Sequence, residues 1–437
     1  MIKVFLVSLG CDKNRVDGEE VLGHLLQEGY ILADEAEDAD AILINTCGFI
    51  KEAVQESLDM IFSLAKYKKE GKCRLLIVLG CMTQRYKNEA AKALPEADAI
   101  YGINEIEAIL GKMKEVLGRN VNTPACIDRP RILARIKSNI PHIAYIKISD
   151  GCDNNCTYCT IPIIRGGYRS RPMEDILSEC QDLIKAGAKE LVLVAQDTAL
   201  YGTDIYKEPK LHELLRKMAE LEGITWVRLM YAYPEHITDE IIQAIKELPF
   251  VCKYLDMPIQ HSEPKILAKM GRKGNKRSLE ELICKLRKEI PGIIIRTTLM
   301  VGFPGETSSE YDRLCEFVEK MKFDRLGVFP YSKEEGTPAA SIKPQVRLAT
   351  MLARKDELMM LQQAIHFSKQ SARVGMKINV MVDAKTDNNM WLGRSMGDAY
   401  EVDTVVYITG ASNLSVGDVI SVRIVQSVGY DLKGVAE

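Results

Sequence analysis

The pattern of apolar and polar residues predicts three successive regions in the chain. In residues 1–118, wholly apolar short runs alternate with longer amphipathic segments, as in a parallel sheet covered by helices on both faces. We therefore predict an N-terminal α/β domain with a Rossmann-like parallel sheet. Its strands are expected at Lys3–Leu9, Ala41–Thr46, Arg74–Leu79 and around Asp98–Tyr101, and its helices at Val16–Glu28, Lys51–Lys68, Thr83–Leu94 and Glu105–Leu117.

A connector and a repeating strand–helix region follow. Residues 119–141 hold three prolines and five basic residues without clear periodicity, which is typical of a linker. Residues 142–368 contain six apolar strands, each but the last followed by a helix, which predicts an open (β/α)6 partial TIM barrel. Active sites of such barrels lie at the carboxyl ends of the strands. The strands are expected at Ile143–Ser149, Leu191–Ala195, Thr225–Tyr231, Cys252–Met257, Ile293–Val301 and Leu326–Tyr331.

The last region, residues 369–437, follows a long helix expected over Gln345–Ser371. Its apolar runs are short and separated by Gly, Asn and Asp, which favours a small antiparallel β-barrel. The strands are expected at Lys377–Asp383, Trp391–Ser395, Thr404–Thr409 and Val419–Val428.

Composition narrows the class of protein. The 437 residues are 46% hydrophobic and 27% charged with a net charge of −3, as in an ordinary globular protein. No stretch approaches the length of a membrane span, and the first residues are expected to form a buried strand rather than a signal peptide. Twelve cysteines without an export signal indicate a reducing compartment, the cytoplasm, where thiols serve metals or catalysis.

Three of these cysteines lie within eight residues at the start of the barrel region. The run is Asp150-Gly-Cys-Asp-Asn-Asn-Cys-Thr-Tyr-Cys-Thr-Ile-Pro162, which places Cys152, Cys156 and Cys159 at i, i+4 and i+7. The two asparagines suit a tight loop, because Asn tolerates left-handed backbone. No further Cys or His follows within twenty residues, so a four-iron cluster held here would keep one iron open for a small molecule.

Three more cysteines follow three successive strands of the N-terminal domain. Cys11, Cys47 and Cys81 each stand at the carboxyl end of a predicted strand and beside a glycine. The carboxyl ends of parallel strands share one edge of the sheet, so the three thiols are expected to face the same edge. We predict a second three-cysteine cluster with an open iron. A zinc site, or two sets of unrelated buried thiols, is the alternative.

Two such cysteine triplets resemble one family, the methylthiotransferases of the radical S-adenosylmethionine (SAM) superfamily. Cys-Asp-Lys-Asn-Arg-Val-Asp-Gly-Glu at 11–19 and Ile-Asn-Thr-Cys-Gly-Phe-Ile-Lys-Glu-Ala at 44–53 are similar to the RimO branch. The C-terminal region resembles a TRAM domain, and its run Asp398-Ala-Tyr-Glu-Val-Asp403 is similar to that branch as well. The tRNA-modifying branch has a Gln-Met-Asn run after the first cysteine and a Val-Arg pair after the second, and this chain has neither.

The resemblance implies an activity and its cofactors: two [4Fe–4S] clusters and SAM. It implies that the Cys152 cluster reduces SAM, and that the resulting radical removes a hydrogen from the β-carbon of an aspartate in small-subunit ribosomal protein twelve (uS12). The Cys11 cluster would supply the methylthio group. The alternative is the same chemistry on a tRNA adenosine. An iron–sulfur electron carrier and a zinc-bearing RNA-binding protein are rivals of another class.

The resemblance also suggests contacts for SAM. Gln196 follows the second barrel strand, Arg296 lies in the fifth, and Tyr158 lies inside the cysteine motif. No residue is assigned a catalytic role. Arginines just after the motif are further candidates to pair with a carboxylate of SAM or of the substrate, because a guanidinium matches that geometry, or else they form a solvated loop. They are Arg165, Arg169 and Arg171.

Charge and family together indicate the partners. From Lys369 onward seven Lys or Arg stand against eight Asp or Glu, whereas a surface for a phosphate backbone is expected to be basic. A basic protein such as uS12, free or in the ribosomal subunit, therefore suits this region better, although RNA contact through the TRAM-like domain stays open. A flavodoxin or ferredoxin is expected as reductant, and no membrane partner is expected.

Overall fold

A computed structural model describes residues 1–118, 140–386, 390–411 and 413–437. The described chain forms two compact units. The first comprises residues 1–118 with Asp150–Asp153 and Cys159–Tyr168, and the second comprises the remainder. Nearly all of the predicted connector, with Cys126, lies outside the described residues.

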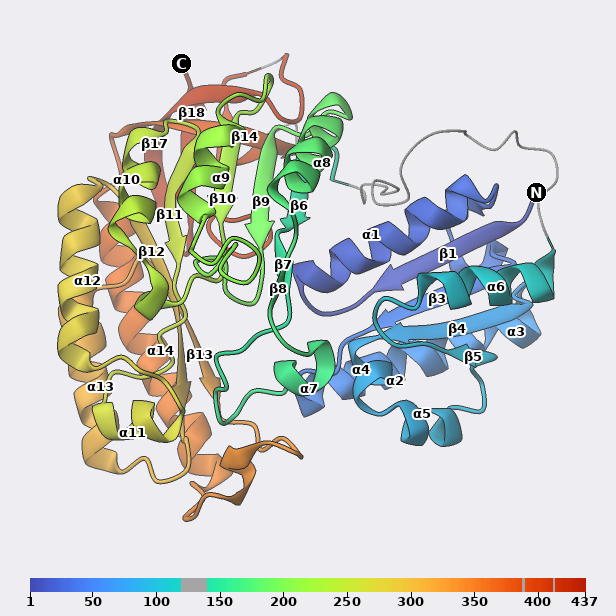
Figure 1. Ribbon diagram of the computed structural model, residues 1–437. Helices are drawn as coiled ribbons and strands as arrows, with labels where there is room; N and C mark the ends of the chain where they lie inside the picture. The colour runs from blue at the N-terminus through green and yellow to red at the C-terminus, as the bar shows by residue number, and fades with distance from the viewer. Residues whose placement is uncertain (119–139, 387–389, 412) are drawn as a thin grey trace. The chain divides into compact units, whose positions relative to one another are not determined.

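A five-stranded parallel sheet forms the centre of the first unit, in the order β2-β1-β3-β4-β5. The strands that precede the three cysteines are therefore direct neighbours. Figure 1 shows this sheet in blue and cyan. The elements are β1 (Lys3–Ser8), α1 (Asp12–Gln27), β2 (Ile31–Leu32), β3 (Ala41–Thr46), α2 (Lys51–Ala65), α3 (Tyr67–Glu70), β4 (Leu75–Gly80), α4 (Cys81–Arg85), α5 (Lys87–Ala93), β5 (Ala99–Ile100), α6 (Ile106–Leu117) and, from the later segment, α7 (Ile161–Arg165).

Helices cover both faces of this sheet, as the unbroken apolar strands predict. Leu43 and Ile77 point to the face covered by α1 and α6. Ile42 and Val78 point to the other face, covered by α2 and α5. Alternate residues of each strand are thus buried on opposite sides, which fixes the register of the strands and holds their carboxyl ends at one edge.

Two helices differ from the prediction where they meet the cysteines. Helix α1 begins at Asp12, four residues earlier than expected, with Cys11 as its extended N-cap residue. Its first turn is polar, so apolar periodicity could not reveal it, yet Lys13 and Asn14 are buried. The helix expected at Thr83–Leu94 begins at Cys81 and divides at Tyr86 into α4 and α5. Both differences place the cysteines at the starts of helices.

The second unit contains a six-stranded parallel sheet in the order β13-β12-β11-β10-β9-β6. This confirms the predicted (β/α)6 partial barrel, which stays open because β6 and β13 do not pair with each other. The elements are β6 (Ile143–Lys147), β7 (Ser149–Asp150), β8 (Arg169–Ser170), α8 (Met173–Lys185), β9 (Glu190–Val194), α9 (Leu211–Met218), β10 (Trp226–Leu229), α10 (Asp239–Glu247), β11 (Val251–Asp256), α11 (Pro264–Lys269), α12 (Lys276–Glu289), β12 (Ile294–Val301), α13 (Ser308–Met321), β13 (Arg325–Pro330) and α14 (Leu348–Ser371).

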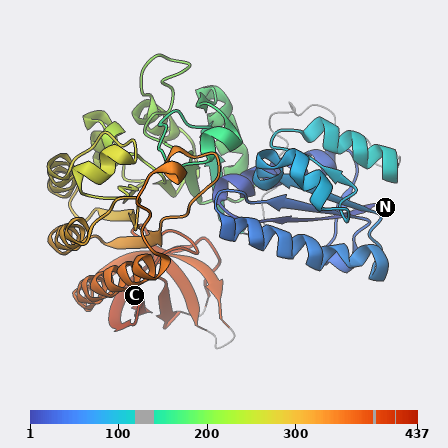
Figure 2. The same cartoon turned by 90° about the horizontal axis from the view of Figure 1, so that it is seen from below.

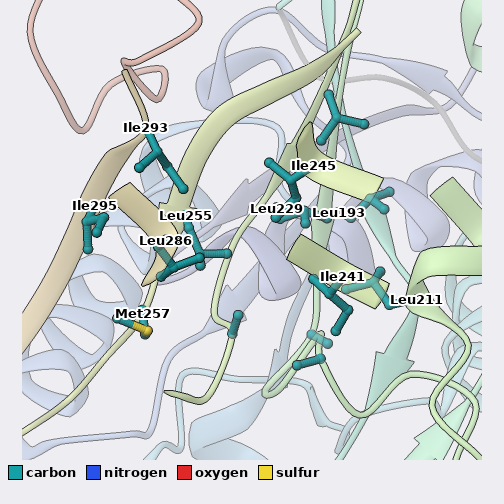
Figure 3. Close-up of a cluster of buried hydrophobic side chains, with 14 of the residues drawn as sticks. Leu193, Leu211, Leu229, Ile241, Ile245, Leu255, Met257, Leu286, Ile293 and Ile295 are labelled. Carbon is teal, nitrogen blue, oxygen red and sulfur yellow. The ribbon is translucent and has the colours of Figure 1, made fainter. Parts of the chain in front are cut away.

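The core of this unit lies between the strands and their outer helices. Figure 3 shows Leu193, Leu229 and Leu255 from three adjacent strands, packed with Ile241 and other residues of the helices. These side chains are fully or almost fully buried. Burial of each such side chain contributes about 1.5–3 kcal/mol. The core therefore fixes the strands whose ends carry the polar residues described below.

The C-terminal strands close into a five-stranded barrel, in the order β14-β15-β16-β18-β17. Figure 2 shows this barrel in red beside α14. The barrel confirms the predicted fold, with one correction: β16 and β18 pair in parallel, so the barrel is not purely antiparallel. The fifth strand was missed because Gly429 and Tyr430 leave only a tight turn after β17. The elements are β14 (Lys377–Lys385), β15 (Trp391–Ser395), β16 (Val406–Thr409), β17 (Val419–Val428) and β18 (Asp431–Ala436).

Buried charges join this small barrel to the amino ends of the large barrel's strands. Glu190, the first residue of β9, accepts hydrogen bonds from Arg228 at 2.6 Å and from Arg394 of the small barrel at 2.7 Å. Arg394 also binds Asp383. Next to this group, Arg325 of β13 forms an ion pair with Asp398. The C-terminal module is thus an integral part of the second unit.

Among the described residues, none of the helices combines the length and apolar character that crossing a membrane requires.

Candidate functional site

The edge of the N-terminal sheet gathers three thiols. Cys47 and Cys81 directly follow β3 and β4, and Cys11 follows β1 after two residues; these three strands are neighbours in the sheet. Burial is the main cause of the raised pKa of Cys47 and of Cys81, and the Cys11 thiol adds to the rise in each. The Cys47 backbone is fixed by the Ser57 hydroxyl, which donates to its carbonyl at 3.0 Å and accepts from its N–H at 3.1 Å. The three cysteines therefore stand at the carboxyl edge of one sheet, and their role as a cluster site stays a prediction.

Close backbone approach at this edge depends on Gly10. Its φ is +86°, and a Cβ there would lie 2.8 Å from the Cys47 sulfur, so no larger residue fits without displacing that thiol. Asn14 then ties the two loops together, because its amide donates to the carbonyl of Leu9 at 2.7 Å and to that of Thr46 at 3.3 Å. The loops that carry the thiols are therefore held in fixed positions.

Burial controls the protonation of these thiols in the metal-free protein. Burial raises the pKa of Cys47, and it raises the pKa of Cys81 to about 12, although Arg165 acts in the opposite direction. The raised pKa favours the protonated thiol at Cys47 and Cys81, and a bound metal would replace those protons, because a coordinating thiol is deprotonated by the metal.

Arg165 brings a positive charge to the same edge. It ends α7, six residues after Cys159, and its side chain is 1% exposed. The guanidinium donates to Asp17 at 2.7 Å, to Asp150 at 3.1 Å and to the Cys81 sulfur at 3.3 Å. Burial lowers the pKa of Arg165, but these acidic neighbours outweigh it and raise the pKa overall. Arg165 is therefore an internal charge of the first unit.

The second cysteine motif begins on a tightly packed backbone. The N–H of Cys152 donates to the carbonyl of Gly166 at 3.1 Å, and a Cβ on Gly151 would lie 2.0 Å from the carbonyl oxygen of Gly167. Asn155 adopts the left-handed conformation, with φ at 51°, as the loop prediction required. Cys152 and Cys156 are buried, and Cys159 is partly exposed.

Polar residues of the second unit surround the middle of this motif. Cys156 Sγ lies 2.8 Å from Tyr233 Oη. Asp197, which follows β9, accepts from Asn154 at 3.1 Å and lies 2.6 Å from His236 Nδ1. Arg272 stacks over the Tyr233 ring at 4.0 Å. Sequence analysis missed Tyr233 and Arg272, because nothing in their local sequence marks them as neighbours of a cysteine more than seventy residues earlier.

The predicted SAM contacts differ in their surroundings. Both amide atoms of Gln196 are buried without a hydrogen-bond partner in the described residues. Tyr158 packs edge-on against Phe303. Arg296 already pairs with Asp256 at 3.1 Å and lies 3.8 Å from Asp403, beside a cavity of about 290 Å³. Gln196 therefore has two buried polar atoms that a ligand could hydrogen-bond.

The cysteines also set the kind of metal group that could bind. The described cysteines are free thiols, which prefer soft metals and iron–sulfur clusters. Within the described ranges, no three His, Cys, Asp or Glu side chains converge on a single metal ion. A four-iron cluster spreads its cysteine ligands over different irons, so its thiols need not meet at one point. The donor set fits such a cluster.

Family profiles match three parts of the chain. Residues 3–102 match the uncharacterized protein family UPF0004, residues 146–318 the Radical SAM superfamily, and residues 374–436 the TRAM domain. A [4Fe–4S] cluster and SAM are the cofactors that define the radical SAM superfamily.

Three curated relatives carry the same name, ribosomal protein uS12 methylthiotransferase RimO. The protein of Carboxydothermus hydrogenoformans is 48% identical, with 99% of each chain covered. That of Desulfitobacterium hafniense is 45% identical, over 99% of this chain and 98% of the relative. That of Lachnoclostridium phytofermentans is 44% identical over the full length of both.

Solved structures share the fold at low sequence identity. The radical SAM methyltransferase TsrM of Kitasatospora setae, bound to tryptophan and a SAM analogue, has a TM-score of 0.57 at 14% identity and covers 84% of this chain and 89% of its own. The cobalamin-dependent enzyme OxsB has a TM-score of 0.53 at 12% identity over 82% of this chain and 56% of its own. These similarities support the fold alone.

Proposed function

The chain belongs to the RimO family of radical SAM methylthiotransferases, and from that premise we propose that it adds a methylthio group to an aspartate of uS12. The observation that carries the proposal is the second set of thiols. A radical SAM enzyme needs one cysteine motif, and Cys11, Cys47 and Cys81 form another at the edge of a separate sheet.

Cys152, Cys156 and Cys159 would hold one [4Fe–4S] cluster, and Cys11, Cys47 and Cys81 a second. The unpartnered amide of Gln196 supports the presence of a small polar ligand at the carboxyl end of β9, and SAM fits that role. When bound, the first of these clusters would supply the electron for reductive cleavage of SAM, which gives access to an unactivated C–H bond.

The chain's own residues prepare this chemistry. Tyr233 lies within hydrogen-bond distance of Cys156 and orients its sulfur. Asp197 holds Asn154, and with it the loop between Cys152 and Cys156. Gly10 allows the first two N-terminal thiol loops to meet. We further expect a low-potential flavodoxin or ferredoxin as reductant and a cytoplasmic location.

A direct test compares two substrates. The anaerobically reconstituted full-length chain, with SAM and dithionite, is incubated with uS12 or with tRNA, and both products are analysed by mass spectrometry. We expect a methylthio group on an aspartate of uS12 and none on tRNA adenosine. Modification of tRNA in place of uS12 would overturn the choice of substrate.

A paired substitution tests the two clusters. Cys47→Ala is expected to retain reductive cleavage of SAM while losing methylthiolation, because only the second cluster is damaged. If Cys47→Ala retains both activities, the N-terminal thiols do not supply the sulfur.

A further inference from the structure

The side chain of Arg165 has more anionic neighbours than an ordinary ion pair requires. Asp17 and Asp150 already provide two carboxylates for one guanidinium. Nonetheless Nη2, which donates to Asp17, also donates to the Cys81 sulfur at 3.3 Å. A neutral thiol is a weak acceptor, whereas a thiolate takes a charge-assisted hydrogen bond. The geometry therefore suits the deprotonated sulfur that Cys81 would present as a cluster ligand.

The three N-terminal cysteines differ in this respect. The sulfur of Cys47 faces the backbone N–H groups of Gly48 and Phe49, which carry no net charge. Cys81 is the one of the three for which the described residues supply a cationic side-chain donor. Asn14 Oδ1 lies 3.7 Å from the same sulfur. It is an acceptor, so it can bond to Cys81 only while the thiol is protonated. Replacement of that proton by iron leaves Arg165 as the stronger partner.

Arg165 reaches this position from a distant part of the sequence. It follows Cys81 by 84 residues and belongs to the segment directly after the radical SAM cysteines. That segment is anchored in the first unit, because Thr160 Oγ1 donates to the carbonyl of Phe49 at 3.1 Å and α7 packs against α4. The donor is thus held rigidly, with its charge shielded from solvent.

We propose that Arg165 is a positioning residue for the N-terminal cluster, which fixes the Cys81 sulfur and sets the reduction potential of that cluster. The proposal rests on the function proposed above, in which Cys11, Cys47 and Cys81 hold a cluster. A buried positive charge beside a ligand sulfur stabilises the more negative, reduced state, since hydrogen bonds to the sulfurs and net charge tune the potential of such clusters.

The test uses the full-length chain with Cys152, Cys156 and Cys159 all changed to Ala, so that only the N-terminal cluster is measured. Iron and sulfide are counted after anaerobic reconstitution, and the potential is found by redox titration followed by electron paramagnetic resonance. Arg165→Met is expected to shift the electron equilibrium at least tenfold toward the oxidised state, about 59 mV for one electron. Arg165→Lys is expected to restore part of the shift.

Two control variants separate this effect from damage to the fold. Arg165→Met removes a positive charge beside Asp17 and Asp150, so the variant Arg165→Met/Asp17→Asn removes one charge of each sign and keeps the net charge of the parent. It should unfold at the temperature of the parent and still show the lower potential. Asp17→Asn alone keeps the donor to Cys81 and should leave the potential unchanged or slightly higher.

The outcomes decide between the two proposals. If the parent holds iron and the charge-balanced variant has the same potential and spectrum as the parent, Arg165 does not tune the cluster, while the proposed function stands. If the parent with intact Arg165 binds no iron, the second cluster and this inference fall together.

Discussion

The two ends of the large barrel differ in whether their buried polar groups have hydrogen-bond partners within the protein. At the amino end, Glu190 accepts from Arg228 and Arg394 within 2.7 Å, and the small barrel covers the group. At the carboxyl end, Gln196 has neither amide atom bonded. Both ends are buried and polar, so burial does not separate a structural site from a functional one. The difference lies in whether the protein itself satisfies the polar groups.

The largest expected effect is a loss of activity from a substitution at the carboxyl end. Cys156→Ala at the carboxyl end should abolish both SAM cleavage and methylthiolation, because the radical SAM cluster loses a ligand. Production of 5′-deoxyadenosine, measured by chromatography, checks this. Cys284→Ala, an exposed cysteine on α12, is the matched control and should be fully active. Cleavage of SAM by Cys156→Ala would remove this residue from the cluster.

A substitution at the amino end should lower the stability of the fold and leave the activity unchanged. Glu190→Gln leaves the buried guanidinium groups of Arg228 and Arg394 without their shared carboxylate, and breaking such a buried pair costs about 3–5 kcal/mol. Chemical denaturation measures this loss, and activity per folded molecule should be unchanged. In the control Glu437→Gln, whose ion pair with Arg423 is on the surface, no measurable change is expected.

Low pH should also reduce the stability that Glu190 contributes at the amino end. Burial raises the pKa of Glu190, but Arg228 and Arg394 outweigh it and hold the pKa at about 2, below the ordinary 4.5. The folded-state pKa is depressed, so the charge of Glu190 stabilises the fold above pH 4.5, and this stabilisation is lost as pH falls from 4.5 toward 2. The difference in unfolding free energy between wild type and Glu190→Gln should shrink over that range. A constant difference would contradict the depressed pKa.

The smallest effect concerns Gln196. Gln196→Ala should weaken SAM binding about tenfold, the value of one hydrogen bond of about 1.4 kcal/mol. It should not destabilise the ligand-free protein, because it removes buried amide atoms that lack a partner. Equilibrium dialysis with SAM and thermal unfolding measure the two effects. Gln243→Ala, an exposed amide on α10 bonded to Glu247, is the control. Unchanged SAM affinity would exclude the contact.

Sequence patterns predicted the sheet and the barrel because their strands are continuously apolar. They also placed Cys11, Cys47 and Cys81 at one edge of that sheet, since parallel strands end at one edge, while their role as cluster ligands stays a prediction. They could not predict that Arg165 would contact Cys81, because that contact depends on tertiary packing across 84 residues. The early start of α1 was hidden for a related reason: its polar first turn is buried against the loops rather than exposed.

The ion pairs of Arg296 also depend on tertiary packing. The resemblance suggested Arg296 as a SAM contact, which stays a prediction, and the structure adds that its guanidinium pairs with Asp256 and lies 3.8 Å from Asp403 of the C-terminal module. Position along a strand does not reveal which carboxylates the fold will bring to a guanidinium.

The ion pairs between the C-terminal module and the large barrel limit where the chain can be truncated or joined to another protein. Asp398 forms an ion pair with Arg325 and Arg394 forms one with Glu190, so a fragment ending near residue 371 would expose Arg325 and Glu190 to water without these partners. Exchanging the C-terminal module for one from another protein would succeed only if the donor carried matching charges. Cutting or exchanging the chain at this joint is therefore expected to destabilise the large barrel.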